Sequence, residues 1–400
     1  MLLVSSGSGS RGGGEIFLAY LGKGLADRDH EVLMWIPDDR RMDELADKCS
    51  PFAHIVRANY RNTYDYRARS LSTCFNWTVS RRVTREWGTL RPDIIHINKQ
   101  NLEDGLDLLR AVRRCATPSV CTIHLTQTAS YLHARAASLR DRVAHWQLSK
   151  YKGVFVAVQE RRCAVLREFL SARGRTKTIC NGVPLINYRA LRALREAKRA
   201  TLGLTAGDFL VLGVGRLVEQ KRPFLFMDIA KQLHARLPEA RFLWVGDGKL
   251  AEQWQKTIMA EKLEGVISWS GWQADVLPYL LAGDLLLHVA EFEGLPFAVI
   301  EAMAAGVPCA LTRDFATELS FFDESNALFV DDAGELAKNL QDPLTLARVK
   351  EGGCRLVENK LSMSKMVESY EQLYRDAIAI GSTNKTNYRK MQCNPSDRAD

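Results

Sequence analysis

Two glutamates in the second half of the chain have the spacing and surroundings of a ligand-binding pair. Seven residues separate Glu293 from Glu301, and a Gly-Leu-Pro turn lies between them. Pro296 and Phe297 are suited to begin a helix, and the amides of its first turn would form an anion site. One turn further along that helix, the Glu301 carboxylate could accept hydrogen bonds from both hydroxyls of a ribose.

A solvated loop followed by an amphipathic helix would also account for two glutamates. It would not account for the small residues Ala-Met-Ala-Ala-Gly over 302–306, which favour close packing of a helix on a sheet. We therefore prefer a binding site at this segment.

Arg216 and Lys221 follow a strand predicted over 209–214 and stand on either side of one turn. The Arg fork and the Lys point charge suit a diphosphate, whose negative charge grows when a sugar departs from it. Two solvated cations on a surface turn are the alternative. The position at a strand end favours the diphosphate site.

A glycine-rich loop, residues 7–14, separates a strand expected over 2–5 from a helix expected over 16–29. The amides at the start of that helix could hold a phosphate. The loop lacks the full G-x-G-x-x-G spacing followed by an acid, so a nicotinamide site is less well supported. A flexible Gly/Ser linker is the other alternative.

His124 directly follows a strand predicted over 119–123. Contact with a transferred sugar or an acceptor and a role as a buried core histidine both remain open for it. Among the histidines, cysteines and acidic residues we find no spacing typical of metal ligands. We expect neither a metal nor a cofactor.

Strand-like and helix-like segments alternate along the chain. This pattern predicts an α/β protein with parallel sheets covered by helices on both faces. The strands are expected over 2–5, 31–36, 93–97, 119–124, 153–158, 209–214, 241–245, 285–289 and 308–311. The helices are expected over 16–29, 102–114, 135–151, 188–199, 222–236, 250–262, 297–305, 343–358 and 362–380.

The composition agrees with a globular protein of two domains. The chain has 400 residues, of which 46% are hydrophobic and 26% charged. No run approaches the roughly 18 to 20 apolar residues of a membrane span, and no signal peptide is visible. The nine scattered cysteines resemble reduced cytosolic thiols more than a disulfide framework.

The charge is distributed unevenly. Residues 1–200 contain 34 Lys and Arg against 19 Asp and Glu, a net charge of +15, whereas residues 201–400 contain 21 against 28, a net charge of −7. Two arginine clusters lie among aromatic residues, at positions 57, 61, 67 and 69 and at positions 81, 82 and 85. They contain no recognisable nucleic-acid module. A surface that meets an anionic membrane or an anionic lipid-linked acceptor and a solvated variable loop both remain open.

The segment 291–308 resembles the E-x7-E motif of the retaining glycosyltransferases of family GT4, the glycosyl transferases group 1 of GT-B fold. Four further segments resemble motifs of that family in order and spacing, and the match runs from residue 1 to about 380. They are Gly215–Lys221 (GRLxxxKG, with Arg222 in place of the last glycine), Gly246–Gly248 (GxG), Asn181–Val183 (NGVD, with Pro184 in place of the acid) and Gly12–Glu15 (GGxE).

The resemblance implies that Glu293 lies by the donor sugar and Glu301 by the ribose, and that a histidine near position 124 contacts the sugar or the acceptor. The candidate catalytic residues are therefore Arg216, Lys221, Glu293 and His124. The candidate donor-binding residues are Gly13, Gly14, Gly215, Arg216, Lys221, Gly246, Gly248, Glu293, Gly294, Leu295, Pro296, Phe297 and Glu301.

The resemblance also implies a GT-B architecture, with two Rossmann-like doubly wound domains that face each other across a cleft. We expect an acceptor-side domain over 1–183, a domain that binds the nucleotide-sugar donor over 184–361, and a helix over 362–380 that crosses back to the N-terminal domain. Residues 381–400 are polar and aperiodic, so we expect a disordered tail there.

The expected function is transfer of a sugar from a nucleotide-diphosphate donor to a hydroxyl of a glycan, a glycolipid or a small molecule, with retention of configuration. A UDP-sugar is favoured over a GDP-sugar, and such enzymes serve polysaccharide or lipopolysaccharide biosynthesis. The alternatives are a UDP-sugar 2-epimerase of the same architecture and a non-catalytic sugar-nucleotide-binding scaffold. We expect a cytoplasmic protein that does not bind nucleic acid, and peripheral contact with the inner face of the membrane remains open.

Overall fold

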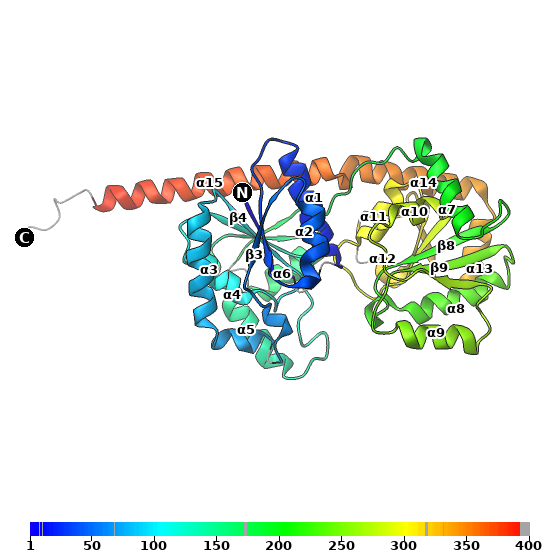
Figure 1. The fold of residues 1–400 in the computed structure, drawn as a ribbon, viewed down its shortest axis with the longest axis horizontal. Helices are drawn as coiled ribbons and strands as arrows, with labels where there is room; N and C mark the ends of the chain where they lie inside the picture. Colours follow the sequence, from blue (N-terminus) through cyan, green and yellow to red (C-terminus); the bar gives the residue numbers. More distant parts are fainter. Residues whose placement is uncertain are drawn as a thin grey trace, which may run out of the picture. The chain divides into compact units, whose positions relative to one another are not determined.

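The computed structural model describes residues 1–392 apart from Ser8, Ser10, Ala68, residues 172–173, residues 317–318 and Asp331. The chain divides into two compact units (Figure 1). Unit 1 consists of residues 1–181 and the segment from Met363 onward, and unit 2 consists of residues 182–362. The division between them falls inside the Asn181–Pro184 turn.

Unit 1 contains a parallel sheet of seven strands in the order β3-β2-β1-β4-β5-β6-β7. Its central strands are apolar and buried on both faces, as a parallel sheet between two helix layers requires. The strands are β1 (Leu2–Ser5), β2 (Leu33–Pro37), β3 (His54–Ala58), β4 (Ile95–Lys99), β5 (Ser119–Ile123), β6 (Val154–Ala157) and β7 (Arg175–Thr178).

Helices connect these strands and cover the sheet. Figure 1 shows α1 and α2 on one side of the sheet and α3, α4 and α5 on the other. The helices are α1 (Gly13–Ala26), α2 (Asp43–Cys49), α3 (Trp77–Leu90), α4 (Leu106–Val112), α5 (Ala137–Leu148), α6 (Glu160–Phe169) and α15 (Met363–Gln392), with short 3-10 turns η1 (Arg40–Met42), η2 (Thr63–Asp65) and η3 (Arg69–Cys74).

Unit 2 repeats this architecture with six parallel strands in the order β10-β9-β8-β11-β12-β13. The strands are β8 (Phe209–Val214), β9 (Ala240–Val245), β10 (Ile267–Trp269), β11 (Leu285–His288), β12 (Cys309–Thr312) and β13 (Leu328–Val330). The helical segments are η4 (Tyr188–Leu191), α7 (Arg192–Thr201), η5 (Glu219–Lys221), α8 (Pro223–His234), α9 (Ala251–Ala260), α10 (Leu277–Ala282), α11 (Phe297–Ala304), α12 (Arg313–Ala316), α13 (Ala333–Leu340), α14 (Pro343–Leu356) and the π-helical turn η6 (Val357–Leu361).

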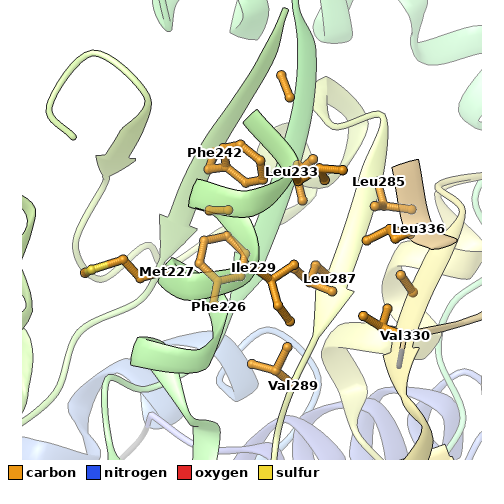
Figure 2. Packing of buried hydrophobic residues seen from close by; sticks show 14 of the residues in the cluster. Phe226, Met227, Ile229, Leu233, Phe242, Leu285, Leu287, Val289, Val330 and Leu336 are labelled. Carbon is orange, nitrogen blue, oxygen red and sulfur yellow. The ribbon is translucent and has the colours of Figure 1, made fainter. Parts of the chain in front are cut away.

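The core of unit 2 lies between the sheet and α8 (Figure 2). Phe226 and Leu233 of α8 are fully buried among Phe242, Leu285 and Leu287 of the strands. Burying one such side chain contributes about 1.5–3 kcal/mol to the stability of the fold. This packing therefore stabilises the strands whose ends carry the candidate site.

Helix α15 packs on unit 1 against α1 and β5. A Cβ at Gly24 of α1 would lie 2.4 Å from a methyl carbon of Val367, so the glycine permits the close contact. The hydroxyl of Tyr374 lies 2.5 Å from Nδ1 of His96, and that of Tyr370 lies 2.8 Å from Oγ1 of Thr122. These contacts confirm the prediction that the last helix returns to the first domain.

The same helix extends to Gln392, beyond residue 380, where we expected the tail to begin. Residues 393–400 of that expected tail lie outside the described residues. No helix in the described part of the chain is long and apolar enough to cross a membrane.

Candidate functional site

Two loops of unit 2 meet at the carboxyl ends of β8 and β11. The backbone amide of Glu291 donates to the carbonyl of Gln220 (2.9 Å), and the Gln220 amide side chain donates to the carbonyl of Phe292 (2.8 Å). These bonds bring the Lys221 ammonium and the Glu293 carboxylate into an ion pair. The side chains are only 15% and 13% exposed, so the pair is largely withdrawn from water. Our sequence analysis placed both residues at one site but did not predict their pairing.

Arg216 lies on the same turn and is exposed. Within the described residues its side chain forms no hydrogen bond and no ion pair. The Lys221–Glu293 pair is neutral as a unit, so Arg216 gives this strand end an uncompensated positive charge. A diphosphate would find here one free guanidinium beside one paired ammonium.

The glycines of the two predicted turns allow backbone to pack directly on backbone. Gly246 has φ +132°, and a Cβ on it would lie 2.1 Å from the carbonyl oxygen of Gly215. A Cβ on Gly248 would lie 2.4 Å from the carbonyl oxygen of Leu217. Neither position can hold a side chain unless the turn that carries Arg216 moves.

Arg222 occupies the place of the glycine in the GRLxxxKG pattern and has φ +47° and ψ +52°. This left-handed conformation costs a residue with a Cβ roughly 1–2 kcal/mol, whereas glycine adopts it freely. The Arg222 side chain forms an ion pair with Asp314 (2.7 Å). The structure thus gives the physical reason for a glycine at this point.

Helix α11 begins as predicted, with Pro296 at its N-cap and Phe297 as its first residue. Gly294, Leu295, Pro296 and Phe297 are all buried, and the N-cap residue Pro296 itself makes no side-chain hydrogen bond to the helix. Glu301 is half-buried on the next turn. The start of the helix therefore directly follows the loop that holds Glu293.

His288, at the end of β11, is buried beside the Phe315 ring, with centroids 4.9 Å apart. Burial lowers its pKa far below the ordinary value, and the positive charge of Lys221 lowers it further. The imidazole is therefore neutral at pH 7. Our sequence analysis did not single out His288, because nothing in its neighbourhood along the chain indicates that it lies near Lys221.

In unit 1, Gly13 and Gly14 form the first turn of α1. A Cβ on Gly14 would lie within 2.5 Å of the Gln100 side-chain amide, so a larger residue here would require the Gln100 side chain to move. The Gln100 amide in turn donates to the Glu15 carboxylate (2.8 Å). The predicted loop is thus held by residues of the neighbouring strand end.

His124 is buried directly after β5. Its Nε2 lies 2.8 Å from Oδ1 of Asn98, whose Nδ2 donates to the carbonyl of Gly14 (2.9 Å). Because that carbonyl can only accept, the Asn98 oxygen must face His124, and Nε2 carries the proton. Burial lowers the pKa of His124 to about 4, so the ring is neutral and its Nδ1 is left as an acceptor. Asn98 connects His124 to the glycine loop and was missed by the sequence analysis.

The candidate residues therefore form two sets. Unit 2 brings together Gly215, Arg216, Lys221, Gly246, Gly248, Glu293 and α11 with Glu301, and unit 1 brings together Gly13, Gly14 and His124. Among the residues that the structure describes, no group of three or more His, Cys, Asp or Glu side chains could hold a metal ion.

Comparison with known families agrees with this arrangement. Residues 208–345 match the family described as Glycosyl transferases group 1, and residues 11–186 match Glycosyltransferase Family 4. The chain belongs to the group 1, family 4 glycosyltransferases. The two matched segments cover the sheet of unit 2, every strand of unit 1 except β1 and, in unit 2, the Arg216–Lys221 turn, the glycine turn and the two glutamates.

Curated relatives include enzymes of surface glycan assembly. The chain is 26% identical over 208 residues to the UDP-Gal:α-D-GlcNAc-diphosphoundecaprenol α-1,3-galactosyltransferase of Escherichia coli, which is 50% of this chain and 54% of the relative. It is 28% identical over 202 residues to the lipopolysaccharide core biosynthesis glycosyltransferase LpsD of Rhizobium meliloti, which is 49% of this chain and 57% of the relative. The chain thus spans about half the length of these relatives.

A solved structure identifies the architecture. HepE of Anabaena in complex with UDP-glucose superposes with a TM-score of 0.72 at 19% sequence identity, and the match covers 94% of this chain and 99% of that one. The two doubly wound units and the returning helix α15 are therefore those of the GT-B fold.

Proposed function

We propose that this family 4 protein transfers a sugar from a nucleoside diphosphate to a hydroxyl group, with retention of configuration. The observation that carries the proposal lies at the ends of β8 and β11, where Arg216 shares a turn with Lys221 and Lys221 pairs with Glu293. Gly246 and Gly248 let the neighbouring turn pack directly on the turn of Arg216. A diphosphate leaving group needs such a cluster, because negative charge develops on it as the glycosidic bond breaks.

Each predicted residue has a role in this reaction. Arg216 and Lys221 hold the diphosphate, together with backbone amides of Gly294, Leu295 and Phe297 around the start of α11, where Pro296 fixes the backbone. Glu293 orients Lys221 and accepts hydrogen bonds from hydroxyl groups of the donor sugar. Glu301 binds the ribose. Gly215, Gly246 and Gly248 keep the backbone close to the nucleotide.

Unit 1 contributes the acceptor side. Gly13 and Gly14 present the amides of the first turn of α1 to a phosphate, and His124, which burial keeps neutral, offers an acceptor nitrogen to a hydroxyl group. We assign no protein nucleophile, so stabilisation of the departing diphosphate is the main source of catalysis. The acceptor hydroxyl then loses its proton to the departing phosphate oxygen.

The relatives suggest the substrate class. The E. coli relative is named for a UDP-sugar and a diphosphoundecaprenol-linked acceptor, and HepE was solved with UDP-glucose. We therefore propose a UDP-sugar donor and a glycan acceptor carried on a lipid, with peripheral contact to an anionic membrane through the basic unit 1. A metal is not part of this proposal.

A donor screen tests the proposal. The protein is incubated with UDP- and GDP-sugars, with and without lipid-linked or soluble saccharide acceptors, and release of the nucleoside diphosphate and the product are measured. We expect UDP release that depends on the acceptor, and a product of retained configuration. Conversion of a UDP-sugar without acceptor would indicate the epimerase instead, and donor binding without turnover for any pair would indicate the scaffold.

A further inference from the structure

A cavity of about 340 Å³ lies at the amino-terminal end of the unit 2 sheet. Its lining includes Phe209 at the start of β8, Asp284 just before β11 and Pro308 just before β12. Tyr188 of η4 and Lys350 of α14 contribute to the other walls. Because the strands of this sheet are parallel, the candidate donor site at their carboxyl ends lies at the opposite end of the sheet.

Lys350 is a cation of this cavity that the fold does not neutralise. Its side chain is half-buried, and in the described part of the chain it makes no hydrogen bond and no ion pair. The ammonium lies 4.8 Å from the centroid of the Tyr188 ring. Burial lowers the pKa of Lys350, and the positive charges of Arg195 and Arg189 lower it further. A half-buried ammonium beside other cations is unfavourable in the free protein, and a bound anion would relieve that cost.

Asp284, the carboxylate among the lining residues, is already paired twice. Its Oδ1 accepts from Nη2 of Arg195 (2.5 Å), and its Oδ2 accepts from Nη1 of Arg199 (2.9 Å). Nη1 of Arg195 also donates to the carbonyl of Leu281 (2.6 Å). Two guanidinium groups therefore share one carboxylate. With the ammonium of Lys350 added, the cavity keeps a net positive charge.

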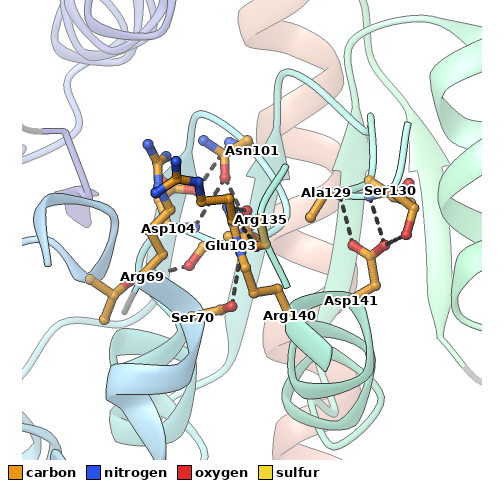
Figure 3. A network of polar contacts seen from close by, with 12 residues as sticks. Arg69, Ser70, Asn101, Glu103, Asp104, Ala129, Ser130, Arg135, Arg140 and Asp141 are labelled. Carbon is orange, nitrogen blue, oxygen red and sulfur yellow. Dashed lines mark hydrogen bonds and ion pairs between the residues drawn. The ribbon is translucent and has the colours of Figure 1, made fainter. Parts of the chain in front are cut away.

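A polar network of unit 1 shows, for comparison, a buried charge that is satisfied within the fold (Figure 3). The Glu103 carboxylate accepts from the Ser70 hydroxyl of η3 (2.8 Å) and from Nε of Arg140 on α5 (2.8 Å). The side chains of Glu103 and Arg140 are only 7% and 11% exposed. Lys350 has no comparable acceptor among the described residues, so a ligand is the natural source of one.

The rest of the cavity wall is apolar. Phe209, Leu281 and Leu346 line it, and the Tyr188 ring is held in place by a glycine. A Cβ on Gly306, whose φ is +69°, would lie 2.7 Å from three carbons of that ring, so the ring packs directly on the backbone. One ammonium beside an apolar wall suits an organic anion better than an inorganic ion, because small-molecule sites combine apolar surface with a few polar groups.

We propose that this cavity binds a small organic monoanion, with its carboxylate on the Lys350 ammonium and its apolar body against Phe209, Leu281 and Leu346. A carboxylate and an ammonium form a charge-assisted hydrogen bond, and the cavity volume falls within the range of small-molecule sites, roughly 300–1,000 Å³. Because the cavity and the candidate donor site lie at opposite ends of one sheet, the anion and a nucleotide can bind at the same time. The inference does not depend on the transfer reaction.

Benzoate binding tests the inference without any sugar transfer. The full chain is titrated with benzoate, with its neutral analogue benzamide and with inorganic phosphate, and binding is followed by saturation-transfer NMR, which detects weak ligands. We expect benzoate to bind at least about tenfold more tightly than benzamide or phosphate, the usual scale for a hydrogen bond between charged groups. Only benzoate combines a negative charge with an apolar body. Saturating UDP should leave benzoate binding unchanged.

Three variants locate the bound anion. Lys350→Met should weaken benzoate binding at least about tenfold without lowering the free energy of unfolding, because the ammonium that it removes has no acceptor among the described residues. Lys338→Met is the matched control, since it removes the charge of an exposed lysine on α13, and it should bind benzoate like the wild type. Ala347→Phe keeps the charge and fills the cavity from an exposed position on α14. It should weaken binding with an unchanged circular dichroism spectrum.

Several results would overturn the inference. Phosphate that binds as tightly as benzoate would indicate an adventitious ion only, and displacement of benzoate by UDP would place it in the donor site. Equal loss of binding in Lys338→Met would show that the charge of Lys350 has no special role. A Lys350→Met variant that unfolds more easily but binds benzoate like the wild type would assign Lys350 to the fold alone. None of these measurements uses a donor sugar, so this test and the donor screen can fail separately.

Discussion

At the scale of single residues, the two cations at the ends of β8 and β11 differ in their environment. Arg216 is exposed and without an acidic partner in the described residues, whereas Lys221 is largely buried in an ion pair with Glu293. Both cations can bind a diphosphate, but only Lys221 also makes an ion pair that stabilises the fold. Substitutions of the two residues should therefore differ in their effect on stability.

We expect Arg216→Ala and Lys221→Ala each to lower turnover by about 100-fold, the usual scale for loss of one electrostatic stabiliser. The melting temperature should be unchanged for Arg216→Ala. Lys221→Ala should lower the free energy of unfolding by about 1–3 kcal/mol, because it leaves the Glu293 carboxylate buried without its cation. From the sequence alone we would have expected little change for either. Steady-state kinetics and urea titration measure the two effects, and near-wild-type turnover in both variants would contradict the site assignment.

The backbone at Arg222 offers a test of strain that is separate from the side chain. Arg222→Gly and Arg222→Ala both remove the ion pair with Asp314, which is worth at most about 1 kcal/mol at this exposure. Only glycine also removes the cost of the left-handed conformation. We expect the Gly variant to be more stable than the Ala variant by about 1 kcal/mol in urea unfolding. An Ala variant as stable as the Gly variant would show that the backbone at residue 222 carries no such strain.

At the scale of elements, two buried histidines connect segments of unit 1 that are distant in sequence through hydrogen bonds. His96 of β4 lies between the Tyr374 hydroxyl of α15 and Thr122 of β5, and His124 is linked through Asn98 to the start of α1. Burial lowers the pKa of His96 to about 3 and that of His124 to about 4. Burial therefore keeps both rings neutral in the folded protein at pH 7.

We expect unit 1 to lose stability as the pH falls from about 6.5, the ordinary histidine value, toward 4. In that range the histidines bind protons in the unfolded chain but not in the folded protein. The free energy of unfolding therefore falls by about 1.4 kcal/mol per pH unit for each histidine. The variants His96→Gln and His124→Gln should each reduce this slope, and substitution of the exposed His54 should leave it unchanged. Urea unfolding at several pH values measures the slopes, and identical slopes in all three variants would contradict the burial argument.

At the scale of the whole molecule, we propose that the two units bind different ligands, with the nucleotide on unit 2. The candidate donor residues in unit 2 come from the ends of β8, β9 and β11 and from α11, which all belong to one packed sheet and its helices. Binding of a nucleotide there should therefore reduce the motion of several loops together.

We expect UDP to protect residues 215–221 and 293–301 from amide hydrogen exchange, with weaker protection around Gly12–Gly14. The protection should disappear in the Arg216→Ala variant at the same UDP concentration, because the diphosphate clamp is lost. Hydrogen exchange with mass spectrometry locates the protected peptides. Protection confined to residues 1–180 would place the donor on unit 1 and contradict the proposal.

The alternation of buried strands and helices was readable from the sequence, since each central strand is a continuous apolar run that local periodicity reveals. The strands predicted from such runs match β1, β2, β4, β5, β6, β8, β9, β11 and β12, with boundaries shifted by at most a few residues. The four strands that were not predicted, β3, β7, β10 and β13, are the edges of the two sheets. β10 and β13 have only three residues each, and β3 and β7 contain polar, partly exposed residues, so only pairing with a neighbour identifies these strands.

The same distinction holds for the site. Motif spacing alone singled out Arg216, Lys221, Glu293 and Glu301 as candidates, because the turns that carry them are local. The Lys221–Glu293 ion pair and the hydrogen bond that His124 donates to Asn98 join residues from different elements, and no local pattern predicts them. Tertiary structure decided these contacts, because parallel strands bring their carboxyl ends together only after the whole sheet has assembled.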